Sequence, residues 1–223
     1  MRELCELCDR ENIRFISDEI YHGITYPTTV PKIIIGYMAK SEESTSLQFS
    51  NSTIVINSFS KYYSMSGFRL GWLVAPDDLI ESMNALQQNM FINAPTLSQL
   101  SAERCFDEDT DQDLRKNVKE YKKARAIILR ELKKIGIKNI SPADGAFYIY
   151  VDIANFSSSK YNTEYMCDLF LDEERVAFTP GSDFESVKEV GLQRFRINTL
   201  EGLRKRKKQW KGLGFFSLIG GFL

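Results

Sequence analysis

Histidine is almost absent from this chain, and cysteine is scarce. The 223 residues contain one histidine, His22, and four cysteines. Cys5 and Cys8 form a CxxC pair, but no second pair or histidine cluster supplies the remaining ligands of a structural zinc site. The stretch ELCELCDREN places both sulfurs on the apolar stripe of an amphipathic helix. We therefore expect buried structural thiols and neither a metal centre nor a redox pair.

An excess of charge of one sign is missing as well. The 29 basic and 30 acidic residues nearly cancel, so no field of the whole chain would attract nucleic acid or an anionic membrane. The apolar, glycine-rich end of the chain is shorter than the roughly 20 apolar residues that span a bilayer. No signal peptide opens the sequence, which favours a reducing compartment, the cytoplasm. The expected partner is a small molecule or another copy of the protein, with no nucleic acid and no membrane span.

Apolar residues are plentiful, and their order predicts an α/β architecture. Hydrophobic residues make up 43% of the chain and aromatic residues 12%, which is enough for a substantial core. IRFIS, STIVINS and RLGWLVAP are typical of strands, and we expect the last two to be buried. DDLIESMNALQQNM has acidic residues in its first turn and helical spacing, which predicts a helix.

The pattern changes after the middle of the chain. Residues 111–135 form the longest helical signal, with Leu114, Ile128 and Leu132 on one face and Gly136 as its end. Strand, helix, strand and strand patterns follow in AFYIYVD, NTEYMCDLFLDEE, RVAFTP and QRFRINT.

Two lobes are therefore predicted. Residues 1–108 would form part of a large domain with a mostly parallel sheet and flanking helices, and residues 109–200 a smaller α+β domain. Residues 201–223 form an atypical tail that we expect to be disordered.

A single lysine follows a predicted buried strand, with no carboxylate near it in the sequence. This is Lys61, in INSFSKYYSMSGFRLGW. A lysine among apolar neighbours favours its neutral amine, the nucleophile that Schiff-base chemistry requires. Ser58 and Ser60 offer hydroxyl groups, and Arg69 offers a planar fork suited to a phosphate. A lysine for an aldehyde beside donors for a phosphate predicts a site for pyridoxal 5′-phosphate, and an exposed loop lysine is the alternative.

A second motif, Asp-Glu-x-Tyr, stands where the first predicted strand ends. A carboxylate at Asp18 can pair with a protonated pyridine nitrogen, and the hydroxyl of Tyr21 can bond to the phenolic oxygen of the same ring. By itself the motif is a weak signal and favours Asp18 as a helix cap. Its meaning depends on the lysine segment that follows.

Together these motifs resemble the class I/II aminotransferases, pyridoxal-phosphate enzymes of fold type I. The resemblance is carried by SDEIY, SFSK and the spacing Lys-x7-Arg, followed in order by DGAFYIYVD, VAFTPGSDF and FRINT, over roughly residues 1–200. It implies that Lys61 forms the Schiff base and carries the proton, that Asp18 binds the ring nitrogen, and that Tyr21 binds the ring oxygen. Ser58 and Arg69 would hold the phosphate, with Ser60 a weaker candidate.

The resemblance also implies how the substrate is bound. Arg196 in FRINT would clamp the α-carboxylate, and Arg194 is its closest rival. The implied function is an aminotransferase that moves an amino group between an amino acid and a 2-oxo acid, as a homodimer in the full-length family. DGAF and TPGSDF are interpreted as mainly structural turns.

The sequence departs from the family at both ends. Family members carry a long N-terminal portion with a glycine/serine-rich phosphate loop, and no such segment precedes IRFIS here, so the resemblance implies a truncated chain. The basic and apolar tail replaces an expected final amphipathic helix. Two alternatives stay open: a pyridoxal-phosphate-dependent lyase or synthase on the same fold, and a non-catalytic remnant or binding partner of a full-length homologue.

Overall fold

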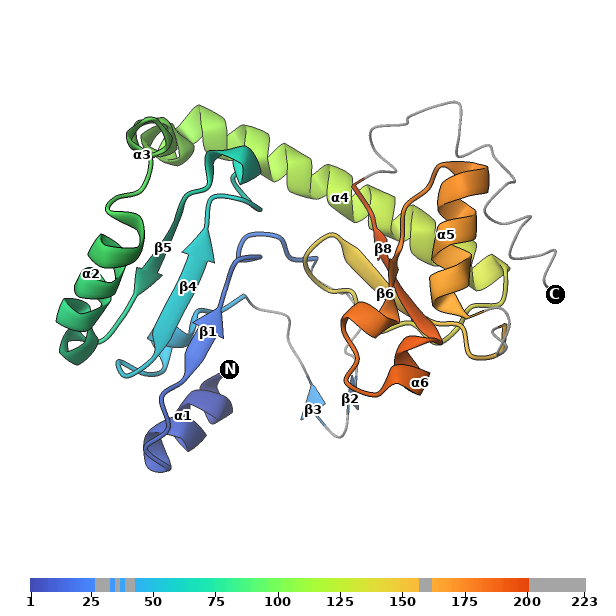
Figure 1. Ribbon diagram of the computed structural model, residues 1–223, viewed down its shortest axis with the longest axis horizontal. Helices are drawn as coiled ribbons and strands as arrows, with labels where there is room; N and C mark the ends of the chain where they lie inside the picture. The colour runs from blue at the N-terminus through green and yellow to red at the C-terminus, as the bar shows by residue number, and fades with distance from the viewer. Residues whose placement is uncertain (27–32, 35–36, 39–42, 157–161, 201–223) are drawn as a thin grey trace. The chain divides into compact units, whose positions relative to one another are not determined.

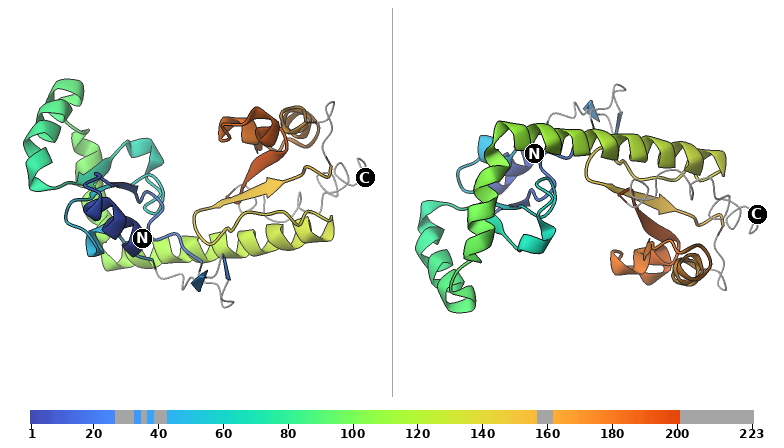
Figure 2. Two further views of the ribbon diagram at one scale, coloured as in Figure 1. Left: turned by 90° about the horizontal axis from the view of Figure 1, so that it is seen from below. Right: turned by 90° about the horizontal axis from the view of Figure 1, so that it is seen from above.

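The computed structural model describes residues 1–26, 33–34, 37–38, 43–156 and 162–200. The chain divides into two compact units, Met1–Asn117 and Val118–Leu223. A long helix, α4 (Glu108–Lys134), begins in the first unit and ends in the second, and Figure 2 shows it as one unbroken helix. The predicted domain boundary after residue 108 falls at the start of α4, whereas the boundary between the two compact units lies inside α4, after Asn117. The predicted tail, 201–223, lies outside the described residues.

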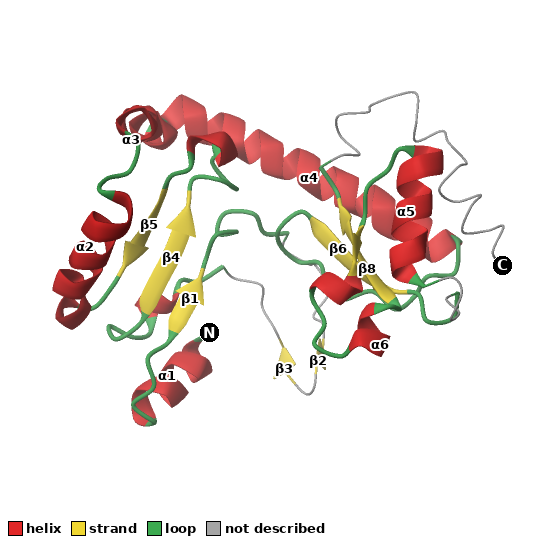
Figure 3. Ribbon diagram, in the orientation of Figure 1, coloured by secondary structure: helices red, strands yellow, loops and turns green. Residues whose placement is uncertain are grey.

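The first unit is built on a three-stranded sheet with the order β1-β4-β5 (Figure 3). Strand β1 (Ile16–Asp18) runs parallel to β4 (Ile54–Ser58), with Asp18 opposite Ile56. Strand β5 (Gly71–Val74) runs antiparallel to β4, with Gly71 opposite Ser58. The carboxyl ends of β1 and β4 and the start of β5 therefore lie at one edge of the sheet, where ligands of α/β proteins commonly bind.

Three helices accompany this sheet, α1 (Arg2–Arg10), α2 (Asp77–Phe91) and α3 (Thr96–Glu103), as Figure 1 shows. A short antiparallel pair, β2 (Ile33–Ile34) and β3 (Tyr37–Met38), lies in the loop-like region predicted between the first two strands. Helix α1 buries Cys5 and Cys8, as its amphipathic pattern predicts, and all four cysteines of the chain are free and buried.

The burial predicted for the strand in RLGWLVAP is wrong. Within the described residues β5 pairs with β4 alone, and its Leu73 and Val74 side chains are 47% and 41% exposed. Ile56 of β4 is also 42% exposed, and α2 buries none of its own residues. An apolar strand is buried only where another layer covers it, and the sequence of the strand does not reveal that layer.

The second unit has strands and helices, as the predicted α+β domain requires, and its sheet is antiparallel. Its strands are β6 (Tyr148–Asp152), β7 (Thr179–Pro180) and β8 (Arg194–Asn198), in the order β6-β8-β7. Helices α5 (Thr163–Glu174) and α6 (Lys188–Gly191) complete the unit. Only the end of RVAFTP forms a strand, because its first residues leave α5 through a left-handed residue, Arg175.

Residue alternation along β8 separates the core of this unit from its polar face. Phe195 and Ile197 are buried and pack in one cluster with Ile128 and Leu132 of α4. Arg194 and Arg196 occupy the alternate positions and are only half-buried. No helix among the described residues is both long and apolar enough to cross a membrane.

Candidate functional site

Lys61 lies in a tight, hydrogen-bonded loop directly after β4. The N–H of Ser64 donates to the Lys61 carbonyl at 3.1 Å, and the N–H of Met65 donates to the Phe59 carbonyl at 3.0 Å. The N–H of Phe59 in turn donates to the Leu70 carbonyl at 3.1 Å, which ties the loop to the start of β5. Lys61 is half-buried and does not lie on an open loop.

Aromatic packing anchors the residues on either side of the lysine. The ring of Phe59 lies 5.0 Å from that of Tyr63 and 4.8 Å from that of Trp72, between centroids. Phe106 adds an edge contact to Phe59 at 6.1 Å. Such ring pairs stabilise by about 1 kcal/mol each beyond the area that they bury. The backbone of Lys61 is therefore held by packing as well as by the hydrogen bonds of its loop.

The predicted phosphate-binding residues gather at the same edge of the sheet. Ser58 ends β4, its Oγ lies 2.9 Å from Ser60 Oγ, and it accepts the Ser60 N–H at 3.0 Å. Arg69 has a left-handed backbone, with φ 52°, at the end of a 3-10 turn two residues before β5. Its Nη1 donates to the Ser66 carbonyl at 3.0 Å, and its side chain is exposed. The Ser58 hydroxyl also lies 3.1 Å from the Leu70 carbonyl, which accepts from it. Two hydroxyl groups and one guanidinium thus stand at this edge of the sheet.

The Asp18–Tyr21 motif forms a turn beside this lysine. Asp18 Oδ1 accepts the Ile20 N–H at 3.1 Å, so the carboxylate shapes its own turn and caps no helix. Lys61 Nζ lies 5.7 Å from the centroid of the Tyr21 ring, within the distance of a cation–π contact. The two motifs, about 40 residues apart in sequence, meet because β1 and β4 are parallel neighbours.

Sequence reasoning missed a buried carboxylate in the same turn, Glu19. Its side chain is 7% exposed, and Oε1 accepts the Ser17 hydroxyl at 3.0 Å and the Ser46 N–H at 2.8 Å. His22 Nδ1 lies 3.7 Å from Oε2. Glu19 thereby fastens the Asp18–Tyr21 turn to the segment before β4. The one sequence signal for its burial is the alternation of side chains along β1. Continued by one residue, this alternation places Glu19 on the side opposite Asp18.

Replacing Glu19 by alanine is expected to lower the free energy of unfolding by about 3 kcal/mol, because two buried donors lose their acceptor. Glu19→Gln retains one acceptor oxygen and is expected to cost about 1 kcal/mol. Urea denaturation followed by circular dichroism measures both. Glu11→Ala is the control, because Glu11 is exposed on the surface, and its effect should stay within about 0.5 kcal/mol. A Glu19→Ala effect as small as that of the control would contradict the assignment.

In the second unit, aromatic rings hold Arg196. Its Cζ lies 4.3 Å from the centroid of Tyr148 and 4.6 Å from that of Phe184. Its Nη2 donates to Thr179 Oγ1 at 3.3 Å. Among the described residues, no carboxylate lies within 4.0 Å of this guanidinium. Contacts with ring faces fix the plane of the guanidinium and leave most of its N–H groups for an anion.

The rival arginine is already paired. Arg194 Nε lies 3.3 Å from Asp152 Oδ2, and Nη1 lies 2.8 Å from Glu185 Oε1. Tyr150 donates its hydroxyl to the same Glu185 oxygen at 2.9 Å, and burial together with this bond raises the pKa of Tyr150 to about 12. The Glu185 carboxylate likewise raises the pKa of Arg194 above its usual value. Arg194 is thus held by two carboxylates, whereas the partners of Arg196 are two rings and the Thr179 hydroxyl.

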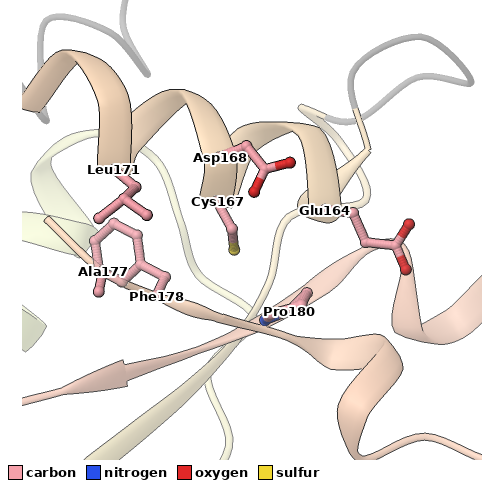
Figure 4. Close-up of a pocket in the computed structure, with 7 residues that line it drawn as sticks. All are labelled: Glu164, Cys167, Asp168, Leu171, Ala177, Phe178 and Pro180. Atoms are coloured by element: carbon pink, nitrogen blue, oxygen red, sulfur yellow. The ribbon is translucent and has the colours of Figure 1, made fainter.

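A hollow of about 260 Å³ lies between α5 and the stretch that leads into β7 (Figure 4). Cys167 points from α5 toward Phe178 and Pro180, and Glu164 and Asp168 stand at the rim. Burial raises the pKa of the Cys167 thiol to about 12, so it stays protonated near neutral pH and is a poor nucleophile. The described residues contain no group of three or more histidine, cysteine or acidic side chains placed to hold a metal ion.

The fold, and the side chains described around Lys61 and Arg196, agree with a family found by sequence comparison. A family model, aminotransferase class I and II, matches residues 1–204, and the chain belongs to this family. It is 36% identical over 181 residues to the valine–pyruvate aminotransferase of Mycobacterium tuberculosis, covering 81% of this chain and 43% of that protein. It is 34% identical over 205 residues to a (5-formylfuran-3-yl)methyl phosphate transaminase of Methanocaldococcus jannaschii. This match covers 92% of this chain and 50% of that protein.

Solved structures give the same result. The crystal structure of an aminotransferase from Mycobacterium tuberculosis matches 97% of this chain and 51% of its own, with a TM-score of 0.79 and 32% identity. The predicted family and the predicted α/β fold class are thus confirmed. The chain spans about half the length of the relatives that it matches.

Pyridoxal 5′-phosphate is the cofactor of this family, and the groups of the first unit fit its functional groups. An amine for the aldehyde is present at Lys61, a carboxylate for the ring nitrogen at Asp18, and a phenol for the ring oxygen at Tyr21. The hydroxyls and guanidinium described above suit a phosphate. All of these groups stand at the edge formed by the ends of β1 and β4 and the start of β5.

Proposed function

We propose that this chain carries the cofactor- and substrate-binding groups of a pyridoxal-phosphate-dependent aminotransferase. Such an enzyme transfers an amino group between an amino acid and a 2-oxo acid. The observation that carries the proposal is the position of Lys61, half-buried at the carboxyl edge of the sheet with its amine 5.7 Å from the Tyr21 ring. Membership of the family supports the same assignment.

The roles of the first unit follow from the chemistry of each side chain. When bound, the cofactor supplies an electron sink for the bonds at the substrate Cα. Lys61 Nζ would hold the cofactor through its aldehyde carbon with loss of water, and, once the substrate amine has displaced it, would move the proton at the substrate Cα. The Asp18 carboxylate would keep the ring nitrogen protonated, and the Tyr21 hydroxyl would donate to the ring oxygen.

Different residues would bind the anionic groups of the cofactor and of the substrate. Ser58 and Arg69 would hold the phosphate, with Ser60 in a supporting place because its hydroxyl contacts that of Ser58. Arg196 binds the α-carboxylate through paired N–H groups, a geometry that guanidinium provides and ammonium does not. The stacked rings of Tyr148 and Phe184 orient that fork.

The experiment that tests this function is a half-reaction with the purified chain and added pyridoxal 5′-phosphate. Valine, aspartate and phenylalanine are offered in turn, since the names of the relatives cover valine–pyruvate, aspartate and aromatic amino acids. The expected product is the matching 2-oxo acid, formed without free ammonia and without cleavage of the carbon skeleton. Release of ammonia together with a fragmented side chain would instead indicate a lyase.

The names of these relatives are those of transaminases, so they give no support to a non-catalytic binding partner or to a lyase. We also infer that the enzyme acts as a homodimer. Exposed apolar side chains on consecutive helices, among them Met90, Phe91 and Leu97, support an interface on α2 and α3. Four free thiols support a reducing, cytoplasmic location.

A further inference from the structure

Tyr62, the residue after Lys61, is clamped between two parts of the first unit. Its ring lies against the backbone of Gly23, where a Cβ atom would stand only 2.5 Å from the ring carbon Cδ2. Gly23 has φ 89°, a conformation that suits glycine and strains other residues. At the other end, the Tyr62 hydroxyl donates to Asp111 Oδ1 at 3.1 Å, in the first turns of α4.

Charge reinforces this clamp. Arg115 lies 2.6 Å from Asp111 Oδ2 and, more than the bond from Tyr62, lowers the pKa of that carboxyl below its usual value. Burial, followed by the bond to Asp111, raises the pKa of Tyr62 to about 12. Near neutral pH the tyrosine is therefore a protonated donor and the aspartate a charged acceptor, which is the stronger kind of hydrogen bond.

The contact of Tyr62 with Gly23 lies beside the contact of Lys61 with Tyr21, so the two residues are held by the same turn. Consecutive residues, Lys61 and Tyr62, meet Tyr21 and Gly23, which lie two residues apart in one turn. That turn is closed by a bond from the Ile24 N–H to the Tyr21 carbonyl at 3.0 Å. A shift of the Tyr62 ring on Gly23 would therefore move the lysine amine over the Tyr21 ring.

We propose that Tyr62 is a positioning residue, which sets where the Lys61 amine lies relative to the Asp18–Tyr21 turn. The inference rests on the proposed function, because it assigns a role in presenting that amine to pyridoxal 5′-phosphate. Tyr62 touches neither cofactor nor substrate in this role. It acts through the ring contact with Gly23 and the hydrogen bond to Asp111.

Three variants separate positioning from simple stability. Tyr62→Ala removes both contacts, and Tyr62→Phe retains the ring on Gly23 but loses the bond to Asp111. Tyr63→Phe is the matched control, because the neighbouring tyrosine contributes its ring to the aromatic cluster around Phe59. Melting temperatures of all three report on the fold.

The readout is the rate at which each lysine of the full chain is labelled by pyridoxal 5′-phosphate and fixed with borohydride. Peptide mapping compares Lys61 with Lys116, the other lysine in the described part of the first unit. Tyr62→Ala is expected to slow labelling at Lys61 by about tenfold and Tyr62→Phe by about threefold, because small displacements of a reacting group cost this much or more. Labelling at Lys116, and labelling of Tyr63→Phe, should not change.

The outcomes distinguish this inference from the proposed function. Preferential labelling of Lys61 in the wild type, with the same rate in Tyr62→Ala, overturns the positioning role and leaves the function standing. If Tyr62→Ala does not fold, Tyr62→Phe is used instead. A wild-type rate of Lys61 labelling in Tyr62→Phe then overturns the positioning role.

A wild type without preferential labelling of Lys61 overturns the proposed function. The positioning role, which rests on that function, is then overturned with it.

Discussion

Replacing Lys61 by alanine is expected to abolish the preferential covalent attachment of pyridoxal 5′-phosphate to the peptide that contains residue 61, and to lower amino transfer by about 10⁴-fold. The amine both attaches the cofactor and carries the proton at the substrate Cα, so a single substitution removes two functions. Borohydride fixation followed by mass spectrometry of the labelled peptide measures the first, and formation of the 2-oxo acid measures the second.

Two controls separate this effect from loss of charge or of any lysine. Lys61→Arg retains the positive charge at the site but provides no nucleophile, so it should be as inactive as Lys61→Ala. Lys116→Ala removes an exposed lysine that is paired with Asp113 at 2.7 Å and should be active at the wild-type level. Equal attachment to Lys116 and Lys61 in the wild-type chain would show that Lys61 has no special reactivity.

The second large effect is expected at Arg196. Arg196→Gln should raise KM for the amino acid by about 10²-fold, because the loss of one partner of a charge pair costs about 3 kcal/mol. Arg196→Lys retains the charge but loses the planar fork, and about a tenfold increase is expected. In both variants kcat should change less than KM, since the carboxylate is bound equally in the ground state and the transition state.

Arg194→Gln is the matched control on the same strand. Arg194 is held by Asp152 and Glu185 and faces the same side of β8 as Arg196, so its loss should leave KM within about threefold. The expected effect is a loss of about 1 kcal/mol in the free energy of unfolding, as for partly exposed ion pairs. A larger rise of KM in Arg194→Gln than in Arg196→Gln would exchange the roles of the two arginines.

Much of the architecture was predictable because local patterns determine it. Helix α4 follows from apolar positions at helical spacing and from a glycine at its end, and Gly136 has the positive φ, 86°, that such an end requires. Strand β8 follows from alternation, with Phe195 and Ile197 inward. These features depend on neighbours within a few residues, which the sequence displays directly.

Other features depend on residues that are distant in sequence. The exposure of Leu73 and Val74 on β5 reflects which layers cover the sheet, and no pattern within the strand encodes them. The roles of Glu19 and Tyr62 depend on Ser46 and Asp111, partners more than 25 residues away along the chain. A glutamate after a strand and a tyrosine after a lysine carry no local sign of such contacts.

The sequence by itself determined which chemical groups are present and in what order: a lysine after an apolar strand, an acidic residue and a tyrosine after another, and arginines at fixed spacing. Those patterns predicted the cofactor because each residue type has a limited chemistry, and their resemblance to a known family predicted the family. Only the tertiary structure decided that the Asp18–Tyr21 turn lies beside Lys61, and that Arg194 is neutralised while Arg196 is held by aromatic rings. The physical reason is that ion pairing, stacking and burial act between side chains that meet through folding, over distances that the sequence does not contain.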